Sequence, residues 1–415
     1  MEKRRAAVTG MGCVTPYGIG LDLFWNSLIN GKSGIREHNL DKEKHVVKIA
    51  GQIPPDIDIE KYIDSKEAKR LDKSIIYALI ASQEAVDDSG LDLEKEDKTR
   101  IGTIVSAAAG GLVVVTTGYQ EMMNRGFHKC SPFTVPMMIA NMASGKVSIR
   151  FGLKGPSKAV LSACATGAHS VGDALRLIQW GDADIVLAGG VESAVCDFGI
   201  GAFTSARTLS RSTRPAQEVS RPYDKDRDGF VLSEGGAVLV LEEMEHAIKR
   251  GAKIYAEITG YGQSSDAYDM VAPDPAGAGA ELAIRSCLKE AGKKPEDIDY
   301  INMHGTSTHL GDLAESNTVA RIFGDRTKNQ KLSVSSTKSM TGHMLGAAGA
   351  AEAIAAVKTI TDSIIPPTIN LDNLDPEAAD LDYVPHKAKK KEVKTAMSNS
   401  FGFGGHNAVL MFEKV

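Results

Sequence analysis

Short apolar segments rich in β-branched residues alternate with longer helix-like segments along the entire chain. The expected strands are residues 6–9, 101–106, 184–188, 237–241, 254–260, 300–303, 332–335 and 407–412. The expected helices are residues 66–88, 167–179, 280–291, 313–323 and 345–360. Alternation of this kind is typical of sheets covered by helices, so the sequence predicts an α/β fold.

A weak internal echo divides the sequence into two halves. Residues 161–170 and 335–344 both run through small residues toward an expected helix. Each half also ends in an expected strand that follows a pair of glycines, 235–236 and 404–405. The echo predicts two related α/β halves, residues 1–250 with Cys164 and residues 251–415 with His304 and His343.

Charge, hydropathy and cysteine spacing exclude several classes of protein. The 415 residues carry a formal net charge of −5, so no excess of positive charge predicts a nucleic-acid partner. No apolar run reaches the roughly 18 residues of a membrane span, and no apolar segment typical of a signal peptide follows the basic N-terminus. The five cysteines are scattered without a CxxC pair, which favours a reduced cytoplasmic enzyme over a disulfide framework or a zinc site.

Cys164 is the first candidate for chemistry. It lies among small residues (162–167, Ser-Ala-Cys-Ala-Thr-Gly), between an apolar segment and an expected helix that ends at Gly181. A sulfur at a strand-to-helix turn lies near free backbone N–H groups and the positive end of the helix dipole, which lowers a thiol pKa. The alternative is a buried structural cysteine, the commoner fate of this residue.

Two of the ten histidines have unusual surroundings. His304 precedes Gly-Thr-Ser-Thr, and His343 follows Lys338-Ser-Met-Thr-Gly. A histidine among small residues at the end of a strand points toward a site more often than into a core, so these two are candidate acid–base or hydrogen-bonding groups. The other eight are interpreted as surface or core residues. Near the C-terminus, residues 399–406 form a glycine-rich loop able to aim backbone N–H groups at one point, as in an oxyanion hole.

These segments together resemble the β-ketoacyl-acyl-carrier-protein synthases, and the resemblance runs from end to end. It is carried by residues 8–12 (VTGMG), 131–133 (SPF), 154–156 (KGP), 163–167 (ACATG), 221–224 (RPYD), 227–231 (RDGFV), 304–308 (HGTST), 336–343 (STKSMTGH) and 399–405 (NSFGFGG). Because the chain has a second histidine at position 343, it resembles the elongating class of these enzymes. The resemblance implies a thiolase-like fold, with two pseudo-duplicated halves in a layered α-β-α-β-α core.

The resemblance also implies roles for residues. Cys164 would take the acyl group as a thioester, and His304 and His343 would bind the malonyl thioester and favour loss of CO2. The other implied site residues are Lys338 beside the histidines, Phe403 as a gate whose N–H joins the oxyanion hole, Thr306 and Thr308 on the phosphopantetheine arm, and Phe401 and Ala109 along the substrate path.

Secondary features follow from the same resemblance. No cofactor is required, the substrates arrive on the phosphopantetheine of acyl carrier protein, and a homodimer is expected. A monovalent cation is implied at Asn302, Glu352, Ser398 and Asn399, and the alternative is a hydrogen-bonded network. Lys66, Lys69, Arg70, Lys129 and Arg207 are a possible basic face for the acidic carrier, although a solvated surface side chain is the commoner role for any single one of them.

Departures from the family pattern leave the acyl chain length open. Ala109 replaces a larger residue near the acyl tunnel, and His309 stands where proline is usual. Three other functions stay open at this point: a ketosynthase of polyketide synthesis, a catalytically inactive relic, and a cysteine hydrolase. Retention of Cys164 argues against the relic.

Overall fold

The protein is described by a computed structural model that covers residues 3–41, 43–324, 326 and 331–415. The main sheet contains β1 (Ala6–Thr15), β2 (Gly18–Ile19), β5 (Ile101–Ala107), β6 (Ile185–Glu192), β7 (Gly235–Glu243), β8 (Ala256–Ser265), β9 (Tyr300–Asn302), β10 (Ser333–Ser335), β13 (Thr395–Gly402) and β14 (His406–Glu413). Two small sheets pair β3 (Arg36–Glu37) with β4 (Ile49–Ala50), and β11 (Ile364–Ile365) with β12 (Lys389–Lys390). None of the helices within these residues is long and apolar enough to cross a membrane.

The helices fill the connections between these strands. They are α1 (Leu21–Ile29), α2 (Ser65–Ala68), α3 (Lys73–Ser89), α4 (Leu112–Arg125), α5 (Thr134–Met138), α6 (Met142–Phe151), α7 (Thr166–Trp180), α8 (Asp197–Ser205), α9 (Met244–Lys249), α10 (Ala278–Ala291), α11 (His309–Phe323), α13 (Lys338–Thr341) and α14 (Ala348–Asp362). Short 3-10 turns, η2 (Ala163–Ala165) and η5 (Leu345–Ala347), precede α7 and α14.

The main sheet shows the same strand pattern twice. In the first set β1 pairs with β7 and β7 with β6 antiparallel, and β6 pairs with β5 in parallel. In the second set β8, β14, β13 and β9 repeat this order and these directions. The two sets join where β1 pairs antiparallel with β8. The boundary at residue 250 stays a prediction.

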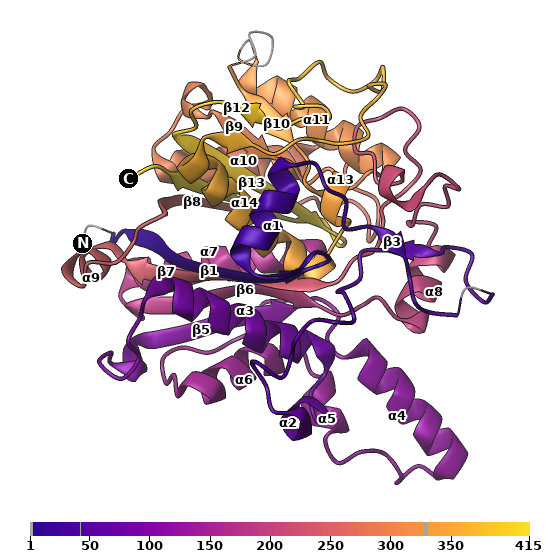
Figure 1. The fold of residues 1–415 in the computed structure, drawn as a ribbon. Helices are drawn as coiled ribbons and strands as arrows, with labels where there is room; N and C mark the ends of the chain where they lie inside the picture. Colours follow the sequence, from indigo (N-terminus) through magenta and orange to yellow (C-terminus); the bar gives the residue numbers. More distant parts are fainter. Residues whose placement is uncertain (1–2, 42, 325, 327–330) are drawn as a thin grey trace.

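Helices and sheet form the expected layers (Figure 1). The central core contains the apolar sides of α7 and α14, while α3 and α6 cover the outer side of the first strand set and α10 and α11 cover the outer side of the second. The two central helices approach closely at Gly167, which has no side chain. A Cβ at this position would lie only 2.7 Å from the backbone N of Ala350. The thiolase-like α/β fold is confirmed.

Several local predictions need correction. The helix predicted over 66–88 is broken into α2 and α3, because Asp72 caps α3 by accepting the N–H of Ser74 at 2.8 Å. Residues 399–402 belong to β13 rather than a loop, since they pair with β14. The segment before Cys164 forms no named strand in the part of the chain that the structure describes, and a short helix, α13, separates His343 from β10. The predicted helix end at Gly181 is confirmed by its left-handed conformation.

Candidate active site

One cavity of about 630 Å³ brings together residues that lie far apart in the sequence. Its lining includes the candidate residues Cys164, His304, His343, Thr306, Thr308, Phe401, Phe403, Ala109 and Arg207. They come from both strand sets and from the turns that precede the two central helices. The structure therefore places a thiol and two imidazoles around one ligand-sized space.

Cys164 occupies the middle of η2, directly before α7. The preceding Ala163 has a positive φ of 50°, a backbone strain that few non-glycine residues adopt outside functional turns. The side chain is buried but still lines the cavity. This turn directs the sulfur toward the cavity rather than into the core between the sheets.

Burial of Cys164 overturns the expectation of a lowered thiol pKa. Burial raises its pKa to about 12, while Lys338 and the backbone N–H of Phe403 act in the opposite direction. Burial therefore outweighs the local effect of the helix start on the pKa of this thiol. The backbone N–H groups of Phe403 and of Cys164 itself both act on the sulfur, so the two donors expected for an oxyanion hole lie beside the atom to which an acyl carbonyl would be bound.

His304 is oriented through its ring Nδ1. Lys338 Nζ lies 3.3 Å from this nitrogen and also forms a buried ion pair with Glu352. An ammonium group only donates hydrogen bonds, so Nδ1 accepts and the ring proton is assigned to Nε2. The neutral ring therefore has an N–H donor available on the side away from Lys338.

His343 packs edge-on against the rings of His304 and Phe230, with ring centroids 5.4 Å and 5.3 Å away. Its backbone N–H donates to the carbonyl of Val231 at 2.8 Å. Neither ring nitrogen has a hydrogen-bond partner among the residues that the structure describes. A fully buried imidazole without partners is poised to bond with a ligand in the cavity.

Both histidines are neutral near neutral pH. Burial holds the pKa of His304 well below its usual range, and the charge of Lys338 and then the neighbouring His343 lower it further. Burial followed by the charge of Lys338 likewise holds the pKa of His343 well below its usual range. Neutral imidazoles can each donate one N–H to a carbonyl oxygen without first losing a proton.

The end of β13 forms the wall opposite Cys164. A Cβ on Gly402 would lie 2.6 Å from the carbonyl of Ser162 and 3.1 Å from the backbone N of Cys164, so only glycine fits there. The neighbouring Phe401 ring lies 5.7 Å from that of His304, and Phe403 lies 6.5 Å from Phe203. This close approach brings the N–H of Phe403 to the sulfur.

Thr306 and Thr308 lie together in the cavity, with their hydroxyl oxygens 2.9 Å apart. The loop that carries them is anchored by Glu315, which the sequence analysis did not single out. Its buried carboxylate accepts the N–H groups of His304 at 2.7 Å and Gly305 at 2.8 Å. Glu315 lies on α11, eleven residues after His304, and only this closeness along the chain could have pointed to its role.

The proposed cation residues lie near one another on β9, β13 and α14. Asn302 and Ser398 are opposite each other in the pairing of β9 with β13. Buried oxygens of all four residues (Asn302 Oδ1, Glu352 Oε2, Ser398 Oγ and Asn399 Oδ1) have no hydrogen-bond partner in the described part of the chain. A hydrogen-bonded network made of these residues alone therefore leaves several oxygens unsatisfied.

The residues of the predicted basic face are exposed. Lys66 is in α2, Lys69 and Arg70 directly follow it, and Lys129 lies between α4 and α5. The Arg70 guanidinium lies 5.2 Å from the ring centroid of Phe133, which connects the α2 region to the segment before α5. Arg207 is at the cavity itself.

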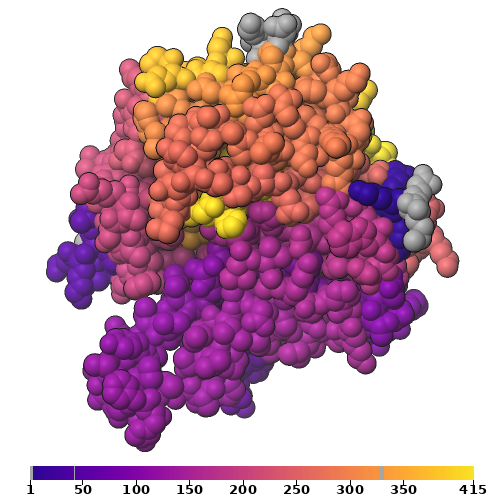
Figure 2. Space-filling model, turned by 180° about the vertical axis from the view of Figure 1, so that it is seen from behind, coloured from indigo at the N-terminus to yellow at the C-terminus, as the bar shows by residue number. Residues whose placement is uncertain are grey.

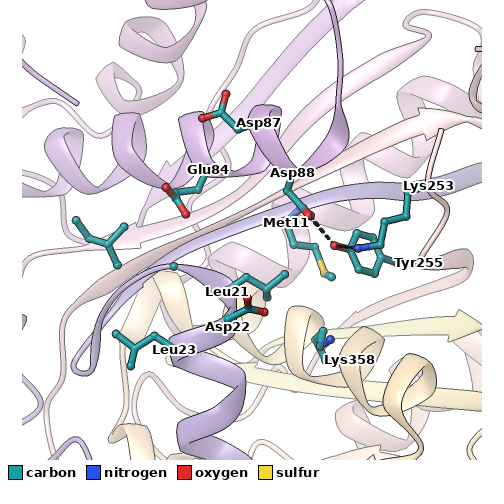
Figure 3. A pocket seen from close by; sticks show the side chains of 12 residues that line it. Met11, Leu21, Asp22, Leu23, Glu84, Asp87, Asp88, Lys253, Tyr255 and Lys358 are labelled. Atoms are coloured by element: carbon teal, nitrogen blue, oxygen red, sulfur yellow. Dashed lines mark hydrogen bonds between the residues drawn. The ribbon is translucent and has the colours of Figure 1, made fainter. Parts of the chain in front are cut away.

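A second cavity of about 580 Å³ lies near the end of α14 that is remote from η5 (Figure 3). Asp88, on α3, accepts the hydroxyl of Tyr255 at 2.7 Å, and Lys253 Nζ lies 2.6 Å from the same hydroxyl. Lys358 of α14 also lines it. None of the predicted site residues lines this cavity.

Comparisons with known proteins agree with this geometry. Residues 3–247 match the N-terminal domain of β-ketoacyl synthases and residues 255–372 match the C-terminal domain. The 3-oxoacyl-[acyl-carrier-protein] synthase 2 of Vibrio cholerae is 46% identical over 100% of both chains, and that of Synechocystis is 45% identical over 100% of this chain and 99% of the relative.

Solved structures give the same result. A β-ketoacyl synthase from Burkholderia phymatum superposes with a TM-score of 0.91 at 33% identity, over 99% of this chain and 100% of the other. A type II polyketide ketosynthase in complex with its acyl-carrier protein gives 0.90 at 32% identity over 100% of both chains. The chain thus belongs to the β-ketoacyl synthase family of condensing enzymes.

Proposed function

We propose that this protein is a 3-oxoacyl-[acyl-carrier-protein] synthase of the elongating class, which joins an acyl thioester to a malonyl thioester in fatty acid synthesis. The observation that carries the proposal is the placement of Cys164, His304 and His343 around one cavity. The relatives with 44–46% identity over the whole chain bear this enzyme's name, which supports fatty acid over polyketide synthesis.

The first half-reaction transfers the acyl group to Cys164. The sulfur attacks the thioester carbonyl, the carrier thiol leaves with the proton that the Cys164 thiol gives up, and a new thioester forms on the enzyme. Negative charge develops on the carbonyl oxygen in the transition state, where the N–H groups of Cys164 and Phe403 stabilise it. Since burial raises the pKa of the Cys164 thiol, this step includes loss of the thiol proton.

The second half-reaction uses the two histidines. The malonyl thioester carbonyl accepts hydrogen bonds from neutral His304 and His343, CO2 leaves, and the C–C bonding electrons form an enolate. The enolate carbon attacks the acyl-Cys164 carbonyl and the Cys164 sulfur leaves as a thiolate. The product is a 3-oxoacyl thioester two carbons longer. Lys338 fixes the His304 tautomer and needs no contact with the substrate.

Acyl carrier protein is the proposed substrate carrier, with Thr306 and Thr308 as hydrogen-bond partners of its phosphopantetheine arm. Lys66, Lys69, Arg70, Lys129 and Arg207 would steer the acidic carrier toward the cavity. Lys69→Glu combined with Arg70→Glu should raise KM for carrier-bound substrates and leave kcat/KM for pantetheine thioesters unchanged. An equal loss with both kinds of substrate would remove these residues from the docking surface.

A monovalent cation fits the cluster of Asn302, Glu352, Ser398 and Asn399. Their unpartnered oxygens are the donors that a hard cation prefers, and one of them belongs to a buried carboxylate. When bound, the ion would supply a fixed positive charge beside Glu352. The proposal requires no other cofactor.

A homodimer and a cytoplasmic location complete the proposal. The exposed side chains Val115, Tyr119, Phe127, Val135 and Ile149 lie on or beside α4, α5 and α6, and an isolated surface rarely exposes so many large apolar groups together. Figure 2 shows the purple segment that contains α4 projecting from the lower half of the molecule.

The proposed cytoplasmic location is supported by the cysteines. All five cysteines are free, as in a reducing compartment.

The decisive experiment supplies acyl and malonyl carrier-protein thioesters of varied acyl length and follows CO2 and product by mass spectrometry. We expect one CO2 for each 3-oxoacyl product and an acyl mass on Cys164. Release of free acid from the acyl thioester without CO2 would identify a hydrolase instead. Products extended more than once before release would favour the polyketide alternative.

A further inference from the structure

The turn that carries Cys164 has a counterpart in the second strand set. The turns η2 and η5 each contain three residues and precede the central helices α7 and α14, which contain 15 residues each. Their first residues, Ala163 and Leu345, have nearly the same positive φ, 50° and 46°. This correspondence matches Cys164 to Gly346.

Each of these turns faces the end of a strand from the other set. The eight-residue strands β6 and β13 hold equivalent places in the repeated pattern. At the end of β13, Gly402 approaches the backbone N of Cys164. At the end of β6, the Glu192 carboxylate accepts the N–H of Gly346 at 3.3 Å. The N–H of Gly346 therefore donates to a carboxylate, whereas the corresponding N–H of Cys164 acts on the Cys164 sulfur.

Glu192 is a buried carboxyl group held by several backbone N–H groups, and burial outweighs these donors and raises its pKa to about 7. Its Oε2 also accepts the N–H groups of Ala108 at 3.2 Å and Ala109 at 3.4 Å. The residue is 0% exposed, and its Oε1 has no partner among the described residues. Three converging backbone N–H groups form an anion-binding nest of the kind that an oxyanion hole also uses.

The groups that Glu192 holds form part of the wall of the catalytic cavity. Ala108, Ala109 and Leu345 line the cavity together with Cys164. We propose that Glu192 is a positioning residue that fills the counterpart of the oxyanion hole and thereby fixes the acyl-side wall beside Cys164. This inference rests on the proposed condensing function. Above its own raised pKa of about 7, the negative charge of Glu192 also raises the pKa of the Cys164 thiol.

Two substitutions separate the charge from the filling of the nest. Glu192→Gln keeps the shape and removes the charge, so the pH midpoint for alkylation of Cys164 by iodoacetamide should fall. Glu192→Ala empties the nest, so kcat/KM for acylation should fall at least tenfold, with a loss that depends on acyl length. Sodium formate, a carboxylate small enough to replace the missing group, should raise kcat/KM for acylation by Glu192→Ala at least threefold.

The matched control is Glu234→Gln. Glu234 is also buried with one unpartnered oxygen, but it accepts the N–H of Ile53 and neither residue lines the cavity. This variant should change neither the alkylation midpoint nor the acylation rate. In a Cys164→Gln background, Glu192→Ala should leave decarboxylation of malonyl thioester within twofold, since the histidines do not contact Glu192.

Three outcomes would overturn the inference: an unchanged alkylation midpoint in Glu192→Gln, unchanged acylation in a folded Glu192→Ala, or a loss in the latter that formate does not reduce. If Glu192→Ala does not fold, the Glu192→Gln midpoint alone decides. A wild-type enzyme that neither acylates Cys164 nor releases CO2 would instead contradict the proposed function, independently of Glu192.

Discussion

In the proposed mechanism Cys164 carries the acyl group, whereas decarboxylation of the malonyl thioester depends on the two histidines, so variants of Cys164 should separate condensation from decarboxylation. Cys164→Ala should lower condensation by at least about 10³-fold, because no nucleophile remains, while the free energy of unfolding changes by less than about 1 kcal/mol. Cys164→Gln should also lose condensation but continue to release CO2 from malonyl thioester, since its amide carbonyl resembles the acylated cysteine. Product mass and CO2 measure the two activities, and condensation by Cys164→Ala would remove the thiol from the mechanism.

Lys338 affects both histidines and also stabilises a buried charge. Lys338→Met leaves Glu352 buried without its partner, which should cost about 3–5 kcal/mol in the free energy of unfolding. Decarboxylation should fall about 10²-fold, because His304 loses the group that fixes its tautomer. Lys358→Met is the control, since Lys358 pairs with Asp362 outside the catalytic cavity and such partly exposed pairs contribute about 0–1 kcal/mol.

The pH dependence of Lys338→Met gives a separate test. Lys338 lowers the pKa of both histidines, so its removal should raise these pKa values. Imidazole protonation stops activity as the pH falls, and a higher pKa brings that loss to a higher pH. The acidic limb of the pH–rate profile should therefore move upward. A limb that stays in place would show that Lys338 does not control the charge of His304 and His343.

At the level of secondary-structure elements, the contact of β13 with η2 should control the proposed oxyanion hole. Gly402→Ala would place a Cβ 2.6 Å from the carbonyl of Ser162, so the strand end and the N–H of Phe403 must move away from Cys164. Acylation of Cys164 should fall about 10²-fold, the usual effect of losing one oxyanion donor. Stopped-flow acylation with a mass readout measures it.

The control for this contact is Gly201→Ala. Gly201 lies in α8, and a Cβ there would meet nothing within 4 Å among the described residues. Alanine in a helix interior stabilises by about 0.5–1 kcal/mol relative to glycine, so this variant should acylate normally and melt slightly higher. If Gly402→Ala acylated Cys164 as fast as Gly201→Ala does, β13 would not support the oxyanion hole.

At the scale of the whole molecule, the apolar side chains around α4 should determine assembly. Tyr119 and Phe127 are 57% and 77% exposed. Their joint replacement by glutamate should convert a dimer into a 44.2 kDa monomer, because unpaired charges are costly in an interface. Light scattering after size-exclusion chromatography measures the mass. Trp180→Glu, which changes an exposed aromatic residue at the end of α7, should leave the mass unchanged, and a monomeric wild-type protein would contradict the dimer.

Much of the fold and of the site was predictable because it is encoded in local segments. Alternating apolar periodicity predicted the layers, and the small residues around Cys164, His304 and His343 marked turns that reach a cavity. The strand β13 was missed because its sequence, rich in serine, asparagine and glycine, has low strand propensity, and only pairing with β9 and β14 makes it a strand.

Local segments encode the identity of the reactive groups and the turns that carry them, since both depend on residues that are neighbours along the chain. The behaviour of those groups depends on contacts that form only when distant segments pack together. The direction of the Cys164 pKa shift follows from burial by distant segments, which outweighs the local effect of the helix start. The roles of Glu315 and Glu192 likewise arise from N–H groups that folding brings to them. Burial and converging hydrogen bonds are properties of three-dimensional neighbours, so no local pattern records them.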